Sequence, residues 1–341
     1  MGCRIIVHQN KFTVIKKFLP IIGLLLFIYT IYQLDITKIK EAFFSINPIY
    51  VLLILPFTFP RVFLRNYAWK LVQEEQKIHI PFLMSLKIFL IGYFYGSITP
   101  GYLGQLMRLP HLKEYTDEPY GKLFVNSTIE TIVHTFSLYV MIILGAWLVL
   151  SDYPELLLIG TSWMIIFLFF LLFFKRKNRG EWFFGFMIQY FIPKKFKSYL
   201  NQFSDTFYKD FPRVKALLFP MFIGVFTWII IFSQEYLLVV ALDLPIPYLY
   251  FLLLFPLANA AGFIPITFAG LGTRELTAVI LFSTLYGIPG EKMFVVSLLG
   301  FVLTDLFTGF VGFLAAVHEA RKKGISIINM RKKALKRGRE T

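Results

Sequence analysis

The chain has 341 residues, of which 57% are hydrophobic and only 16% carry a charge, and its formal net charge is +15. Soluble globular proteins have about 45–50% apolar and about 25% charged residues, so this composition excludes a water-soluble domain and predicts an all-α polytopic membrane protein. The basic residues lie in tails and loops beside apolar runs, which is typical of cytoplasmic loops and argues against nucleic-acid binding. Cys3 is the single cysteine, so a cysteine-based metal cluster is excluded, and we expect no metal and no cofactor.

The first part of the chain is predicted to cross the membrane four times. The N-terminal arm carries Lys and Arg but no acid, so we expect it in the cytoplasm, with the first crossing leading outward. The second crossing is short and contains Pro56 and Pro60. The loop after it carries Arg61, Arg65 and further lysines, which favours a cytoplasmic position. The four predicted crossings cover residues 18–34, 49–64, 124–150 and 155–174.

The apolar run that opens at Pro81 is predicted to enter the membrane and return to the same side. If residues 81–98 were a full crossing, the strongly basic region 175–215 would lie outside the cell, against the positive-inside rule. A re-entrant hairpin from Pro81 to about Leu112, which turns at residues 100–104, returns the basic region to the cytoplasm. Irregular backbone is not tolerated in contact with lipid, so this turn must pack in protein or line a wet cavity.

The second half repeats this order. Residues 216–242 are predicted to cross outward, a hairpin from Pro247 to about Tyr286 turns at residues 269–272, and residues 292–317 cross inward. Six crossings and two re-entrant hairpins that enter from opposite faces make an inverted repeat. We expect a cell-membrane protein with both termini in the cytoplasm. The predicted organisation is one integral membrane domain over 1–341, with repeat one at about 49–174, repeat two at about 216–317, a basic interfacial linker at 175–215 and a basic tail at 318–341.

A glycine-rich motif occurs once in each predicted hairpin. The first copy is Pro100-Gly101-Tyr102-Leu103-Gly104-Gln105-Leu106-Met107-Arg108, and the second is Phe268-Ala269-Gly270-Leu271-Gly272-Thr273-Arg274-Glu275. Downstream, the Pro, Lys, Phe, Val and Ser of residues 119–127 recur at the same places in 289–297. Broken segments at corresponding positions of two halves indicate a duplicated unit with a transporter-type site, and two unrelated interruptions are the alternative. The predicted helix breaks are Pro100, Gly101, Gly104, Gly270 and Gly272.

Both motifs are followed by an arginine, Arg108 in the first and Arg274 in the second. A charge inside the membrane costs about 2.5–3.5 kcal/mol on insertion scales, so each needs a partner or a function. A guanidinium binds a phosphate through two parallel hydrogen bonds, which makes both arginines candidates for binding a lipid headgroup. Snorkelling to an interface, or a salt bridge to Glu275, is the structural alternative.

Three further polar residues lie in predicted crossings. Glu130 and His134 are four residues apart, so they share one face of a helix. Such a pair is suited to relaying a proton, or to a hydrogen bond between helices that fixes packing. Asp305 is the deepest acid of the second half, and a pair with Arg274 is geometrically feasible.

The chain resembles the flippase-like family typified by the membrane domain of lysylphosphatidylglycerol synthetases, over about residues 15–320. The resemblance rests on Pro100-Gly101-x-Leu103-Gly104-x-x-x-Arg108, on Glu130, and on Gly270-Leu271-Gly272-x-Arg274-Glu275. The chain departs from the family pattern at four positions. Gln105 replaces an acid, Thr131 an arginine and His134 an aspartate, and the arginine often found near Phe301 is missing.

The resemblance implies a membrane transporter that moves an anionic phospholipid or a lipid-linked polyprenyl-phosphate amphiphile between leaflets. The soluble aminoacyl-transferase domain of the two-domain relatives is absent, so we expect no lipid aminoacylation and no enzyme activity. The alternatives are a membrane-embedded lipid-phosphate transferase and a scaffold or regulator that transports nothing. The predicted substrate-binding residues are Arg108, Arg274, Glu130, Glu275, His134 and Asp305.

Overall fold

The structure is a computed structural model that describes residues 23–99, 102–149, 151, 153–175, 211–263, 267 and 269–337. All regular elements of these residues are helices. Among the residues that the structure describes, four helical stretches are long and apolar enough to cross a membrane, and further apolar helices are shorter. At 1.5 Å per residue, 28 residues extend about 42 Å, which exceeds the roughly 30 Å hydrocarbon core of a bilayer. The predicted all-α polytopic membrane fold is therefore confirmed. The four stretches are Pro48–Glu75, Tyr120–Leu148, Val214–Ala241 and Gly290–Lys322.

The second crossing is longer than the sequence indicated. A helix over Gly23–Gln33 and α2 (Ile36–Ser45) precede a continuous rod made of α3 (Pro48–Ile54), η1 (Leu55–Phe57) and α4 (Thr58–Glu75). The prediction of a crossing that ends at residue 64, with Arg61 and Arg65 in a cytoplasmic loop, is wrong, because both arginines lie on α4, where Arg61 is buried and Arg65 is partly buried. Pro56 and Pro60 do not break the rod. Both lie in the first turn of their element, where the missing N–H of proline would be unpaired in any case.

The first hairpin forms with the predicted bounds. α5 (Phe82–Ser97) starts after Pro81, and η2 (Leu103–Met107) and α6 (Arg108–Lys113) pack back on α5. Gly104 lies against the backbone carbonyl of Tyr95, where a Cβ atom would overlap. Tyr102, at the start of η2, has a left-handed backbone with φ 55°. The predicted breaks at Pro100 and Gly101 lie outside the described residues.

The second hairpin consists of α12 (Tyr248–Gly262) and α13 (Thr273–Tyr286), which pack on each other. Gly270 and Gly272 lie between them with φ of 86° and 92°, a conformation that glycine adopts at little cost. A Cβ atom on Gly270 would lie 2.8 Å from the Cα of Gly262. The two arms of the hairpin therefore approach each other through glycine backbone.

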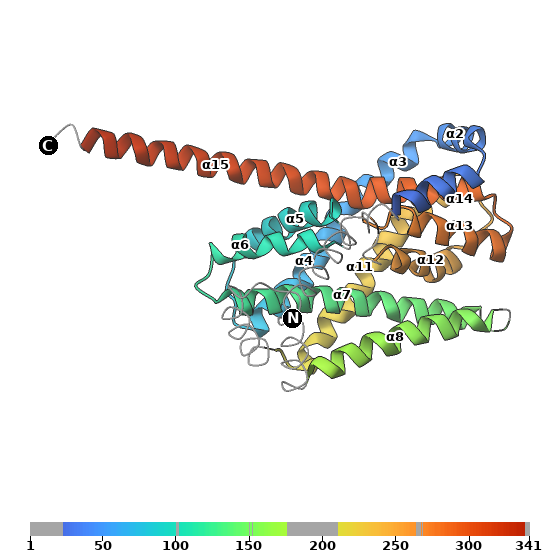
Figure 1. Cartoon of the computed structure of the whole chain (residues 1–341), viewed down its shortest axis with the longest axis horizontal. Helices are drawn as coiled ribbons and strands as arrows, with labels where there is room; N and C mark the ends of the chain where they lie inside the picture. The colour runs from blue at the N-terminus through green and yellow to red at the C-terminus, as the bar shows by residue number, and fades with distance from the viewer. Residues whose placement is uncertain are drawn as a thin grey trace, which may run out of the picture.

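The remaining helices are long, and one of them extends beyond the bundle. α7 (Tyr120–Leu148) and α8 (Pro154–Lys175) pack side by side, and α11 (Val214–Ala241) contacts both halves. α14 (Gly290–Phe301), the π-helical turn η4 (Val302–Leu306) and α15 (Phe307–Arg337) form one rod. Figure 1 shows α15 projecting from the bundle, so the basic tail continues as a helix well past the predicted crossing end at residue 317. The basic linker 176–210 lies outside the described residues.

The contacts between the two halves match each other. α4 packs on α11, α5 packs on α15, and α12 packs on α7. Gly312 of α15 lies against the backbone carbonyl of Leu90 in α5, and Gly145 of α7 lies in the same way against the carbonyl of Leu253 in α12. A side chain at either glycine would overlap that carbonyl oxygen. Each hairpin is thus held through its first arm by a long helix of the other half.

Each hairpin also has its own apolar packing. The larger buried cluster surrounds the second hairpin and includes Phe232, Phe251 and Phe282, whereas a second cluster around α4 and α5 includes Trp69 and Phe89. Many large apolar side chains remain exposed on the outer faces of the helices. Such outward-facing apolar residues suit contact with lipid, and the polar residues are left for the space between the two clusters.

Candidate functional site

A cavity of about 420 Å³ lies between the two hairpins and receives residues from α4, α5, η2, α7, α11, α12 and η4. Two of its aromatic residues come from the hairpin breaks. Tyr102 at the first break and Phe263 at the second have ring centroids 6.0 Å apart, at an interplanar angle of 83°. The cavity therefore lies where the two breaks meet, and polar groups of both halves reach one space.

A triad of charges lies beside the cavity, which Arg65 and Arg108 line and Glu130 does not. Glu130 of α7 accepts a hydrogen bond from Arg65 Nε at 3.0 Å and another from Arg108 Nη2 at 2.8 Å. Arg108 Nη2 also donates to the Ser127 carbonyl at 2.8 Å. Arg108 is 1% exposed and Glu130 is 3% exposed, so the pair has almost no solvent to screen it. Two arginines and one glutamate leave the triad with a net charge of +1.

Aromatic side chains hold both guanidinium groups in place. The Arg108 Cζ atom lies 4.7 Å from the ring centroid of Trp69, and Trp69 Nε1 donates to Asn126 Oδ1 at 2.7 Å. The Arg65 Cζ atom lies 5.3 Å from the Phe89 ring and 5.7 Å from the Tyr93 ring. Cation–π contacts of this kind are strongest away from water, so they orient the arginines without neutralising them.

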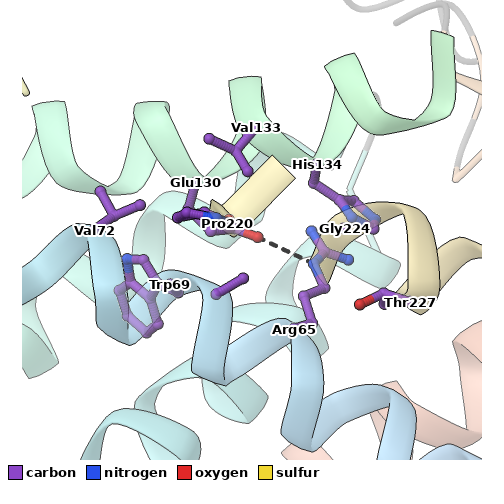
Figure 2. A pocket seen from close by; sticks show the side chains of 10 residues that line it. Arg65, Trp69, Val72, Glu130, Val133, His134, Pro220, Gly224 and Thr227 are labelled. Atoms are coloured by element: carbon purple, nitrogen blue, oxygen red, sulfur yellow. Dashed lines mark hydrogen bonds and ion pairs between the residues drawn. The ribbon is translucent and has the colours of Figure 1, made fainter. Parts of the chain in front are cut away.

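Arg65 has hydrogen-bond donors that are unpaired among the described residues. Its ion pair uses only Nε, and its two terminal nitrogens make no hydrogen bond with any residue that the structure describes. Its side chain is 12% exposed and lines the large cavity. Figure 2 shows Arg65 reaching from α4 toward Glu130 and His134 of α7, at a second small cavity of about 10 Å³. That volume suits about one water molecule, so a bound anion would have to occupy the larger space.

His134 does not bond to Glu130, although the two share a helix face as predicted. Its ring stacks on Trp228 of α11, with centroids 4.2 Å apart and planes 12° apart. Trp228 Nε1 in turn donates to the His134 backbone carbonyl at 2.9 Å. His134 therefore packs α7 on α11 by ring stacking, whereas the proton relay stays a prediction.

Asp305 lies on another wall of the cavity, in the π-helical turn η4. Its carboxylate accepts a hydrogen bond from the Tyr93 hydroxyl of α5. Arg61 fixes the turn, because its Nη2 donates to the Thr304 carbonyl at 2.9 Å and to the Thr308 hydroxyl. π-Helical turns occur frequently at functional sites, and this one places an acid in the same cavity as Arg65 and Arg108.

Arg274 and Glu275 form a closed pair of their own. Arg274 Nη2 lies 2.5 Å from Glu275 Oε1, and Glu275 Oε2 accepts from the Gly272 backbone N–H at 2.6 Å. The Arg274 Cζ atom lies 4.3 Å from the Phe301 ring centroid. The alternative of a salt bridge to Glu275 is therefore formed, and the feasible pair with Asp305 is not. Neither Arg274 nor Glu275 lines the large cavity.

Arg65 was not among the site residues predicted from the sequence. A signal was available, because Arg65 lies at helical spacing from Arg61, Ala68 and Val72, which are buried residues of α4. Three of the four departures from the family pattern line the cavity. They are Gln105, Thr131 and His134.

The comparisons with known proteins agree with this architecture. A family model described as the lysylphosphatidylglycerol synthase TM region matches residues 14–312. No curated protein matches the chain. Because the match covers most of the 341 residues, this multi-pass membrane protein belongs to the lysylphosphatidylglycerol synthase TM region family, whose members are related to lipid handling.

Proposed function

We propose that this protein is a flippase-type lipid transporter of the cell membrane, with both termini in the cytoplasm. It moves an anionic phospholipid or a polyprenyl-phosphate-linked amphiphile between leaflets. One observation carries the proposal: Arg65 presents two terminal nitrogens without partners among the described residues to a 420 Å³ cavity between two broken hairpins. Membership of a lipid-related membrane family supports it.

The electrostatics of the cavity favour a phosphate as the bound group. A guanidinium fork matches two phosphate oxygens, and charge-assisted hydrogen bonds are roughly twice as strong as neutral ones. The triad of Arg65, Arg108 and Glu130 keeps a net charge of +1, because one carboxylate serves two guanidinium groups. An anion bound to Arg65 would complete the charge balance. We therefore propose Arg65 as the primary phosphate contact and Arg108 as its buried support.

Matching contacts in the two halves support alternating access as the transport mode. Gly145 and Gly312 hold the two hairpins in the same manner, and the hairpin tips touch through Tyr102 and Phe263. We infer that the halves form an inverted repeat with re-entrant hairpins. Rocking of one half against the other would separate Tyr102 from Phe263 and open the cavity to one side.

The proposal is tested with purified full-length protein in lipid vesicles. The assay follows headgroup-labelled phosphatidylglycerol and a labelled polyprenyl phosphate, with labelled phosphatidylcholine as the neutral comparison. We expect the protein to accelerate translocation of an anionic lipid. Arg65→Lys keeps the charge but loses the planar fork, so its rate should fall about tenfold, the equivalent of one lost hydrogen bond to a charged group. Arg213→Lys, at an exposed arginine before α11, is the matched control and should keep the wild-type rate.

Two results would count against the proposal. Translocation of both anionic lipids at the rate of protein-free vesicles would refute transport, and equal rates for Arg65→Lys and wild type would refute the role of Arg65. Mass analysis of the recovered lipid separates transport from catalysis. We expect the lipid to be unchanged, whereas a lipid that has lost or gained a phosphate-linked group would favour the membrane transferase alternative.

A further inference from the structure

Glu235 is a buried acid that the proposed site does not use. It lies in the middle of α11, is 2% exposed, and makes no hydrogen bond or ion pair with the residues that the structure describes. Its side chain rests on Gly300 of α14, where a Cβ atom would lie 3.0 Å from Glu235 Cγ and 3.2 Å from Oε1. A lone carboxylate removed from water is costly in its charged form, so a neutral state or a partner is needed.

The charged groups that face Glu235 already have partners. They are Arg274 and Glu275 of α13, Arg61 of α4 and Asp305 of η4. Arg274 binds Glu275, Arg61 binds the backbone and a hydroxyl at the junction of η4 and α15, and Asp305 accepts from a tyrosine. In this arrangement, Glu235 is therefore left without a cation of its own.

Both arginines nevertheless have a hydrogen-bond donor that is unpaired among the described residues. Arg61 Nε and Arg274 Nε are both buried and lack hydrogen-bond partners among the described residues, and so does Glu235 Oε2. An unpaired buried donor or acceptor loses its hydrogen bond to water without gaining another. Either arginine Nε is therefore a potential donor to Glu235 Oε2, but neither hydrogen bond is formed in this arrangement. A movement of α4 or α13 relative to α11 would be needed to form either of them.

In the first half of the chain, an ion pair joins the two helix positions that correspond to Glu235 and Gly300. Arg65 on α4 binds residue 130 on α7, 65 residues further along the chain. Glu235 on α11 faces residue 300 on α14 at the same separation, and there the partner is a glycine. The first half thus closes this contact with an ion pair. The second half leaves an acid facing a residue without a side chain.

We propose that Glu235 is a proton-binding site that couples lipid movement to a proton, an inference that rests on the proposed function. In the arrangement described here, Glu235 holds a proton as a neutral carboxylic acid. When the two halves rearrange, the acid releases that proton to water on one side of the membrane. The resulting carboxylate then accepts a hydrogen bond from Nε of Arg61 or Arg274. Return to the first arrangement takes up one proton from the other side.

The protonated state is tested without any transport. Infrared absorption of the purified full-length protein at pH 7 should contain the carbonyl stretch of a buried, protonated carboxylic acid. Glu235→Gln should lose this band, and Glu291→Gln, the same change at the start of α14, should keep it. Gly300→Ala retains the acid but presses on its Cγ atom, so the band should shift rather than vanish. An identical carboxylic-acid region in wild type and Glu235→Gln overturns the proposal.

Coupling is tested in the vesicle assay with an imposed pH gradient. The gradient should stimulate wild-type translocation, whereas stimulation should be lost in Glu235→Gln and kept in Glu291→Gln. A gradient effect that persists in a folded Glu235→Gln protein overturns the coupling role. The two proposals fail in different ways. If wild type moves no anionic lipid, the proposed function falls while the infrared band still reports on Glu235.

Discussion

Replacing Glu130 by glutamine removes the carboxylate that Arg65 and Arg108 share. Glutamine has nearly the same volume, so the change removes charge rather than packing. Arg108, which is 1% exposed, then keeps a neutral partner, and the net charge of the triad rises from +1 to +2. Breaking a buried ion pair from one side costs about 3–5 kcal/mol, because an uncompensated charge remains. We therefore expect a loss of about 3–5 kcal/mol in unfolding free energy.

The measurement is thermal unfolding of the purified protein in detergent. At about 2 °C per kcal/mol for a chain of this size, Glu130→Gln should lower the midpoint by about 6–10 °C. Glu118→Gln is the matched control, because Glu118 pairs with Lys122 at a more exposed site and should lose less than about 1 kcal/mol. The double variant Glu130→Gln/Arg108→Gln should lose less than the two single variants together, by about 1 kcal/mol or more. If Glu130→Gln and Glu118→Gln have the same unfolding midpoint, the triad does not contribute the expected stability to the fold.

Two further predictions concern the hairpin and the central helix. Gly270 has a left-handed backbone, and a side chain there would overlap α12, so Gly270→Ala should lower the unfolding free energy by about 3 kcal/mol or more. Gly287 is also left-handed but has nothing within 4 Å of a Cβ atom, so Gly287→Ala should lower it by about 1–2 kcal/mol. Equal thermal midpoints for the two would refute the close approach of the hairpin arms. Gln234→Met removes the donor to the Ile54 carbonyl, 2.8 Å away, and should cost about 1–3 kcal/mol by the same measurement. An unchanged midpoint would mean that the Ile54 carbonyl accepts a hydrogen bond from another donor in the variant.

The sequence was sufficient for the elements whose cause is local. An apolar run of sufficient length forms a helix in a membrane, because backbone groups must find partners within the segment. Proline and glycine mark the ends of such runs, and the bounds expected at Pro81, Pro247 and Tyr286 agree with α5, α12 and α13. The turn predicted at residues 269–272 lies between α12 and α13, and Gly270 and Gly272 have positive φ there.

The charged site could be predicted only in part. Glu130 and Arg108 were expected to bind substrate, and the structure brings them together 2.8 Å apart in a buried pair. Arg65 was assigned to a loop, because a basic residue near the end of an apolar run is the usual mark of a membrane boundary. That rule assumes that the cation reaches water, and here α4 continues for a further ten residues past Arg65 to Glu75.

Length, apolar periodicity and the two glycine breaks were readable in the printed chain, because each is governed by residues a few positions apart. Which charges lie inside the protein was decided by partners far along the chain. Arg65 meets Glu130 across 65 residues, and Tyr93 meets Asp305 across 212. A buried charge is stable only beside its counter-charge, so its position depends on how the helices pack. Tertiary structure alone therefore determined that Arg65 joins Arg108 in the cavity lining and that Arg274 does not.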